Sequence, residues 1–235
     1  MKPREPSYQE LMRPPHDPLL LRALSQRLRL LETQAETPTA RAEIEAALAC
    51  PWWGLRELAI RAIGSWGGKA NRAWLTERAR RPLSDYGWVL RRPSGAPEKW
   101  QYLETVACRQ AVVPLLTAED IDWVLDLWFD GFEQSDRSGS FAGFIGETSR
   151  FPLEAQRIRI RREILSPHAS RREAALWMAF NAPNLGLMAE VCRILTAGPD
   201  PKLAALARRL TDIEAHRKAH PEVWGSKEPE SGRLG

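Results

Sequence analysis

Acidic side chains recur at intervals of three or four residues between positions 119 and 133. They are Glu119, Asp122, Asp126, Asp130 and Glu133, and no lysine or arginine occurs between positions 119 and 136. Residues at these intervals share one face of a helix, so the spacing predicts an acidic stripe. Three roles are open for the stripe: a solvated outer face, a docking surface for a basic partner or basic neighbouring helix, or paired catalytic carboxylates. Catalysis would need a carboxyl group with a displaced pKa, and nothing in the sequence marks one.

Arginines dominate the segment from 157 to 172. The members of this arginine block are Arg157, Arg159, Arg161, Arg162, Arg171 and Arg172. Guanidinium groups bind carboxylates and phosphates through paired hydrogen bonds. The block can therefore pair with neighbouring helices, dock an acidic protein, or bind nucleic acid. A second, looser group surrounds an irregular segment at 81–98 and consists of Arg78, Arg80, Arg81, Arg91 and Arg92.

Three other patterns fall short of a catalytic or cofactor motif. Asp212, His216 and His220 are spaced by four residues, but no glutamate follows His216 as it does in a zinc protease. The glycine-rich stretch 138–147 follows no strand pattern and lacks the signatures of a phosphate-binding loop. No serine or cysteine has an evident base beside it. The sequence therefore indicates no metal site and no cofactor, and it favours a protein that is not an enzyme.

The elements that would position these residues are helical almost throughout. The expected helices lie at 19–35, 39–49, 53–66, 69–80, 97–113, 118–130, 152–165, 169–180, 185–197 and 201–219. Prolines 51, 82 and 167 cannot continue a helix, and glycines 64, 67, 68 and 198 suit left-handed C-caps. Thr117 and Asp120 have the spacing of a capping box. Long irregular segments are expected at 81–98 and 131–152.

A short motif occurs twice and indicates a helical repeat. Residues 55–64 read LRELAIRAIG, and Arg-Glu-Ala-Ala-Leu at 172–176 aligns with 56–60 at an offset of 116 residues. The first copy resembles the second helix of a HEAT repeat, and the offset is close to three periods of about 40 residues. The resemblance covers 39–80 and 152–219. It implies an all-α, right-handed, HEAT-like α-solenoid of about ten helices with a distorted middle, in which Ala59 and Ala175 pack closely against partner helices.

Composition and terminal segments set the outline of the chain. A proline-rich arm is expected at 1–18, a HEAT-like helical domain at 19–220 and a polar tail at 221–235. No apolar run approaches the ~18 residues of a membrane span, which predicts a protein without a membrane segment. Three widely spaced cysteines and the absence of a secretory signal predict a cytoplasmic location. Most of the ten tryptophans are expected to fill the core and the layers between repeats.

The resemblance leads to two hypotheses about function. The first is a non-enzymatic interaction scaffold or regulatory adaptor, of the kind that in bacteria often regulates or assembles another component. It would dock an acidic or mixed-charge protein through the arginine block and through Asp122, Asp126 and Asp130. One acidic stripe cannot satisfy arginines on several sides of a helix, so some of Arg157, Arg159, Arg161 and Arg162 are expected to stay exposed. The alternative is a DNA-binding protein related to the HEAT-like alkylpurine DNA glycosylases. In that case Trp123 and Asp126, with Arg157 or Arg161, would resemble their site, but acidic groups near Asp126 would repel phosphates.

Overall fold

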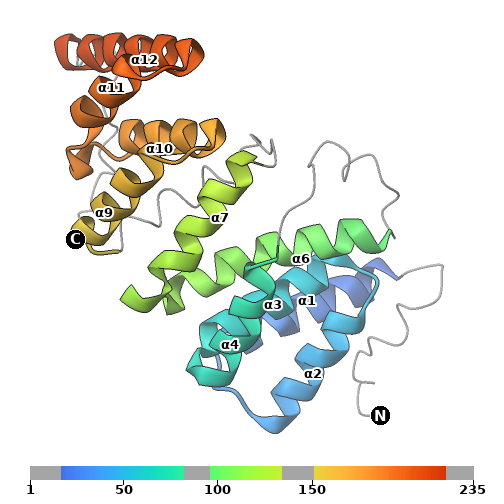
Figure 1. The fold of residues 1–235 in the computed structure, drawn as a ribbon. Helices are drawn as coiled ribbons and strands as arrows, with labels where there is room; N and C mark the ends of the chain where they lie inside the picture. The colour runs from blue at the N-terminus through green and yellow to red at the C-terminus, as the bar shows by residue number, and fades with distance from the viewer. Residues whose placement is uncertain (1–16, 82–95, 134–150, 221–235) are drawn as a thin grey trace, which may run out of the picture. The chain divides into compact units, whose positions relative to one another are not determined.

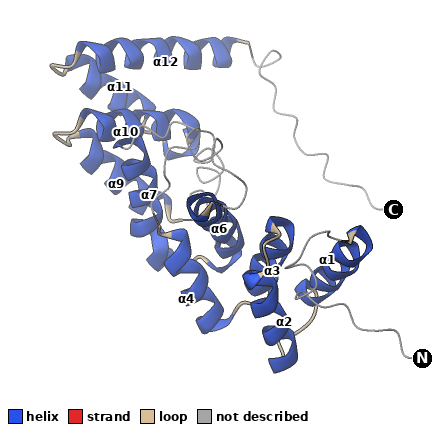
Figure 2. Cartoon of the chain, turned by 90° about the vertical axis from the view of Figure 1, so that its right-hand side faces the viewer, coloured by secondary structure: helices blue, strands red, loops and turns tan. Residues whose placement is uncertain are grey.

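The structure, a computed structural model, describes residues 17–81, 96–133 and 151–220. In these ranges it contains ten α-helices and three short 3-10 helices, and no β-strand (Figure 2). The expected all-α class is therefore confirmed. The proline-rich arm, the tail after Pro221, the glycine-rich stretch 138–147, Arg91 and Arg92 lie outside the described residues, apart from the last residues of the arm.

The chain forms two compact units. Unit 1 comprises Met1–Leu127 and Gln134–Gly143, and unit 2 comprises Trp128–Glu133 and Phe144–Gly235. One helix, α7 (Ile121–Glu133), contributes its first residues to unit 1 and its last residues to unit 2.

Unit 1 is built around a central helix. Its other helices are α1 (Pro18–Glu32), α2 (Pro38–Ala49), α4 (Gly68–Ala79) and α6 (Pro97–Val112). Helix α3 (Trp53–Trp66) packs against all four of them (Figure 1). Leu55, Ile60 and Ile63 of α3 are fully or almost fully buried, so most of the length of this helix faces the core.

Unit 2 repeats this arrangement with fewer helices. Helix α10 (Ala169–Asn181) packs against α9 (Leu153–Ile164), α11 (Met188–Ala197) and α12 (Pro201–Ala219) (Figure 1). The end of α7 joins this core through Phe129, which is fully buried, and through Trp128, whose indole Nε1 donates to the Ala174 carbonyl oxygen at 3.1 Å. Leu176 and Ile160 complete the buried centre.

The helix boundaries agree with the sequence at most positions, for local chemical reasons. Helices α1, α2 and α12 each begin with an Asp or Thr N-cap followed by proline at the first helical position. The start expected at 185 lies at Met188 instead. Residues Pro183–Leu185 form a separate 3-10 turn, which Gly186 ends at a φ of 67°.

The capping box at Thr117 and Asp120 is present, and it initiates the 3-10 turn Ala118–Asp120 that leads into α7. Burial favours the neutral carboxyl group of Asp120. The hydrogen bonds that its carboxylate accepts from Trp123, Thr117 and Arg72 nevertheless hold its pKa below the usual value. Asp120 therefore stays ionised at the start of the helix, where negative charge is favourable.

None of the four glycines expected as left-handed C-caps ends a helix in the αL conformation, although two of them have positive φ angles. Gly67 and Gly68 do have positive φ angles, of 64° and 77°, and turn the chain from α3 into α4. Gly198 has a φ of −77°, which is not left-handed. Gly64 lies inside α3, where an added Cβ would stand 2.7 Å from the carbonyl oxygen of Ala111 in α6. Gly64 is therefore explained by the close approach of two helices.

Ala59 and Ala175 are both fully buried, as expected. We predict that Ala59→Leu and Ala175→Leu will each lower the free energy of unfolding by about 1–3 kcal/mol, because the added carbons must displace packed neighbours. Denaturant titration measures the effect. Ala70→Leu and Ala205→Leu are matched controls at exposed helical positions and should change stability by less than about 0.5 kcal/mol. Equal effects at buried and exposed positions would contradict the close packing.

Candidate functional site

Part of the arginine block forms a buried network in unit 2. Arg159 and Glu163, one helical turn apart on α9, are each 6% exposed in their side chains, and Arg159 Nε donates to Glu163 Oε1 at 2.8 Å. The Arg159 guanidinium also lies 5.2 Å from the ring centroid of Phe129. Arg171 donates to Glu163 at 3.2 Å and also to Asp130. One residue of the acidic stripe and two of the arginine block are thus joined inside one unit.

Two further arginines of the block bind backbone carbonyl groups. Arg157 Nε donates to the Leu185 carbonyl oxygen at 2.9 Å, next to the 3-10 turn. Arg172 Nη1 donates to the carbonyl oxygens of Ser166 and Pro167 at 2.7 and 3.0 Å, in the turn between α9 and α10. These side chains satisfy carbonyl groups in the turns that connect helices, which is a structural role.

The remaining two arginines of the block face outward. Arg161 is 47% exposed and makes a bidentate contact with Glu190 of α11, with two N–O distances of 3.0 Å. The hydrogen bond from Arg161 holds the pKa of Glu190 below its usual value. Arg162 is 64% exposed, and its nearest carboxylate oxygen, on Glu163, is 3.5 Å away. The prediction that some of these arginines stay exposed therefore applies to Arg161 and Arg162.

Exposed apolar side chains accompany these two arginines. Ile158 is 61% exposed and Leu165 is 74% exposed. Arg162 follows Ile158 by four residues, and Leu165, the C-cap residue of α9, follows it by seven. Residues at these intervals lie on one side of a helix. We call Ile158, Arg161, Arg162 and Leu165 the α9 face.

One pattern in the sequence predicts that Ile158 of the α9 face points outward. Residues two apart in sequence are rotated by about 200° around the helix axis, so they lie on nearly opposite sides of the helix. Ile158 and Ile160 therefore cannot both face the core, and the structure buries Ile160 fully. Reading 156–163 as a helix thus implies an outward isoleucine among arginines.

The acidic residues of α7 have different environments. Asp122 is exposed and Asp126 is half-buried, and both lie in unit 1, whereas Asp130 pairs with Arg171 in unit 2. Trp123, part of the glycosylase-like set, is only 8% exposed, and its indole Nε1 donates to Asp120 at 2.9 Å. Its ring therefore belongs to the core and does not line a surface.

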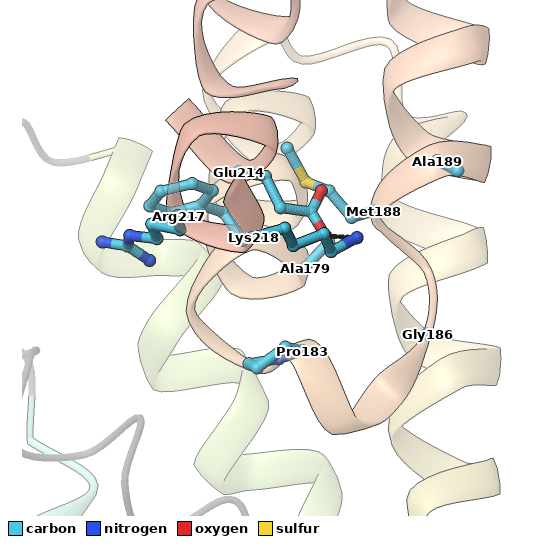
Figure 3. A pocket seen from close by; sticks show the side chains of 9 residues that line it. Ala179, Pro183, Gly186, Met188, Ala189, Glu214, Arg217 and Lys218 are labelled. Carbon is cyan, nitrogen blue, oxygen red and sulfur yellow. Dashed lines mark ion pairs between the residues drawn. The ribbon is translucent and has the colours of Figure 1, made fainter. Parts of the chain in front are cut away.

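A pocket of about 430 Å³ lies in unit 2 between α10, the 3-10 turn, α11 and α12 (Figure 3). Apolar side chains, including Phe180, Pro183 and Met188, form part of its lining. Glu214 and Lys218 form an ion pair of 2.8 Å there (Figure 3). Arg217 lies 4.6 Å from the ring centroid of Phe180. The pocket is large enough for a small molecule and has charged groups of both signs.

The described residues contain no group of three or more side chains placed to hold a metal ion. The rings of His216, on α12, and His220, its C-cap residue, have centroids 4.6 Å apart and are tilted by 49°. All three cysteines are buried, and burial, assisted by the charge of Glu104, raises the pKa of Cys108 to about 12. At neutral pH this thiol is protonated and a poor nucleophile. No helix in the described ranges has the length and apolar character needed to cross a membrane.

No protein-family model, no curated protein and no solved structure matches this chain. Its function is therefore inferred from its own geometry. Within the arginine block, Arg161 and Arg162 are exposed, whereas the other four side chains are buried or half-buried and bind carboxylates or backbone carbonyl groups.

Proposed function

We propose that this chain is a non-enzymatic interaction scaffold or adaptor, built from HEAT-like helix pairs, that docks an acidic protein partner on the α9 face. The two motif copies support the repeat interpretation because they lie in α3 and α10, the helix with the most neighbours in each unit. Helices adjacent in sequence also pack together, as α2 with α3 and α11 with α12. Such stacking is the way a solenoid buries its core and presents an extended surface.

The observation that carries the docking proposal is the α9 face itself. Ile158 and Leu165 leave much of their apolar surface in water, and burying each against a partner is favourable by about 1–2 kcal/mol. Arg162 lies between them, and its guanidinium keeps most of its donors toward solvent. Apolar side chains next to arginine are typical of the centre of protein interfaces. A partner with carboxylates around an apolar contact complements this surface in charge and in polarity.

Charge reversal on the α9 face tests the proposal. We expect Arg161→Glu/Arg162→Glu to weaken capture of the partner by at least about tenfold, because two attractive contacts become repulsive. Ile158→Ser/Leu165→Ser should weaken capture to a similar degree without a change in net charge. Capture is measured by cross-linking and mass spectrometry with the full-length chain as bait, alongside the thermal unfolding midpoint of each variant.

The matched control is Arg208→Glu/Arg209→Glu, which makes the same charge change at two exposed positions of α12. A supporting result is a protein captured by the native chain and by this control but lost with both α9-face variants, at unchanged stability. Equal capture by all four chains would overturn the proposal. The α9-face variants could instead be less stable and yet capture the partner normally under conditions where they stay folded. That result would mean that the arginines have a structural role only.

A further inference from the structure

In unit 1, three arginines surround one glutamate. Glu104 of α6 accepts from Arg56 Nη2 of α3 at 3.0 Å on one carboxylate oxygen. Its other oxygen accepts from Arg78 Nε of α4 at 3.1 Å and from Arg81 Nη1, just past the end of α4, at 3.2 Å. We call these four residues the Glu104 cluster. Glu104 and Arg56 are 15% and 18% exposed, and Arg78 and Arg81 are 21% and 31% exposed, so the cluster is half-buried.

Hydrogen-bond donors remain in the cluster after Glu104 is satisfied. Arg78 uses Nη1 for the Trp74 carbonyl oxygen at 3.3 Å, and Arg81 Nη2 stands 3.7 Å from Glu77. In the part of the chain that the structure describes, Arg78 Nη2 and Arg81 Nε have no acceptor. Arg56 Nε is buried and also has no acceptor there. An arginine offers five N–H donors, and partly buried donors favour an acceptor.

Two tryptophans hold the guanidinium groups in place. Arg78 lies 3.9 Å from the centroid of the Trp74 ring, and Arg56 lies 4.8 Å from that of Trp100. Stacking of this kind fixes the plane of a guanidinium group and leaves its N–H edges to be used. The donors are therefore oriented before any ligand arrives, which lowers the entropy cost of binding.

The cluster also has unbalanced charge. Three guanidinium groups share the single negative charge of Glu104. Glu77, the second carboxylate near Arg78 and Arg81, is 69% exposed and stands 3.7 Å from each, so water screens its contribution. Cys108, one turn after Glu104 on α6, is fully buried, so the cluster lies at the edge of the apolar core. A dianion would neutralise the excess.

We propose that the Glu104 cluster binds the phosphate group of a small molecule, with Arg78 and Arg81 as its principal donors. Phosphate is tetrahedral, carries up to two negative charges at neutral pH, and is recognised by paired guanidinium donors. Arg78 and Arg81 share one carboxylate oxygen of Glu104, so their guanidinium groups lie next to each other, which suits a single anion. A nucleic-acid backbone would instead require a row of cations along successive phosphates. The cluster shares no residue with the α9 face, so the two proposals fail or succeed separately.

Phosphate binding to the full-length chain tests the proposal. Inorganic phosphate is titrated by calorimetry and by thermal unfolding, with sodium chloride at matched ionic strength as the reference. We expect a saturable rise of the unfolding midpoint with phosphate that chloride does not produce. Arg81→Gln should weaken binding by about tenfold, the effect of one charge-assisted contact, and Arg80→Gln, the same change at the exposed neighbour, should not.

A second variant keeps the test informative if Arg81→Gln is unstable. Glu104→Gln removes the competing carboxylate, so phosphate should raise the unfolding midpoint of this variant more than that of the native chain. A rise no greater than with chloride, or equal weakening by Arg80→Gln and Arg81→Gln, would overturn the proposal. Tighter, Arg81-dependent binding of a DNA duplex than of phosphate would also overturn it, in favour of a nucleic-acid surface.

Discussion

Replacement of Arg159 by alanine is expected to lower the free energy of unfolding by about 3–5 kcal/mol. The change would leave the Glu163 carboxylate, 6% exposed, without its hydrogen-bond partner at 2.8 Å. It would also remove the cation from beside the Phe129 ring, in the centre of unit 2. Arg171 would still contact Glu163 at 3.2 Å, but on the other carboxylate oxygen. Urea denaturation, monitored by tryptophan fluorescence and circular dichroism, measures the loss.

Two comparisons separate a buried charge from lost packing. Arg162→Ala removes an arginine that is also near Glu163 but is 64% exposed, and it should cost less than about 1 kcal/mol. The double variant Arg159→Met/Glu163→Leu replaces both buried charges with apolar groups, and it should recover most of the stability that Arg159→Ala loses. If Arg159→Ala and Arg162→Ala cost the same, the Arg159–Glu163 pair is not buried as described.

Gly64→Val should destabilise unit 1 by about 3 kcal/mol, at the upper end of the cost of overpacking. The first added carbon would stand 2.7 Å from the Ala111 carbonyl oxygen, which belongs to the backbone of α6 and cannot rotate away. Helices α3 and α6 would have to separate. Because α3 packs against α1, α2, α4 and α6, the disturbance reaches the whole unit.

The control for this variant lies in the same helix. Gly54 is exposed in the first turn of α3, and a Cβ added there meets no atom within 4 Å. Gly54→Val should therefore change stability by less than about 0.5 kcal/mol. Both variants are compared by denaturant titration at one temperature. A loss at Gly54 as large as that at Gly64 would show that helix propensity, and not the contact with α6, decides the effect.

The fold was predictable from the sequence where local chemistry decides it. Proline at the first helical position marks the starts of α1, α2, α6 and α12, and the box at Thr117 marks the approach to α7. The role of Gly64 was not predictable in this way. A glycine near a helix end suits a cap, but its close neighbour, Ala111, is distant in sequence. Only the packing of α3 on α6 shows that a side chain at position 64 would collide with the neighbouring helix.

The arginines show the same limit at the candidate site. The sequence gives their number and their spread around α9, and from these the exposure of some of them follows. It does not give their partners, because Arg171 pairs with Asp130 at a separation of 41 residues and Arg56 with Glu104 at 48. The Glu104 cluster could not be predicted from the sequence for the same reason. In the sequence, Arg78 and Arg81 flank an irregular segment, while Arg56 belongs to the repeat motif, and nothing places the three side chains together.

The division of α7 between the two units has a consequence for dissecting the protein. Trp128 and Phe129, both buried, complete the core of unit 2, whereas Trp123, Val124 and Leu125 of the same helix are buried in unit 1. A single cut between Leu127 and Trp128 would leave each fragment its own core side chains, but it would divide α7 into two pieces too short to hold a helix alone. Fragments intended to fold alone should overlap, so that each carries its own copy of residues 117–133. Binding data from such fragments would then assign each ligand to one half of the chain.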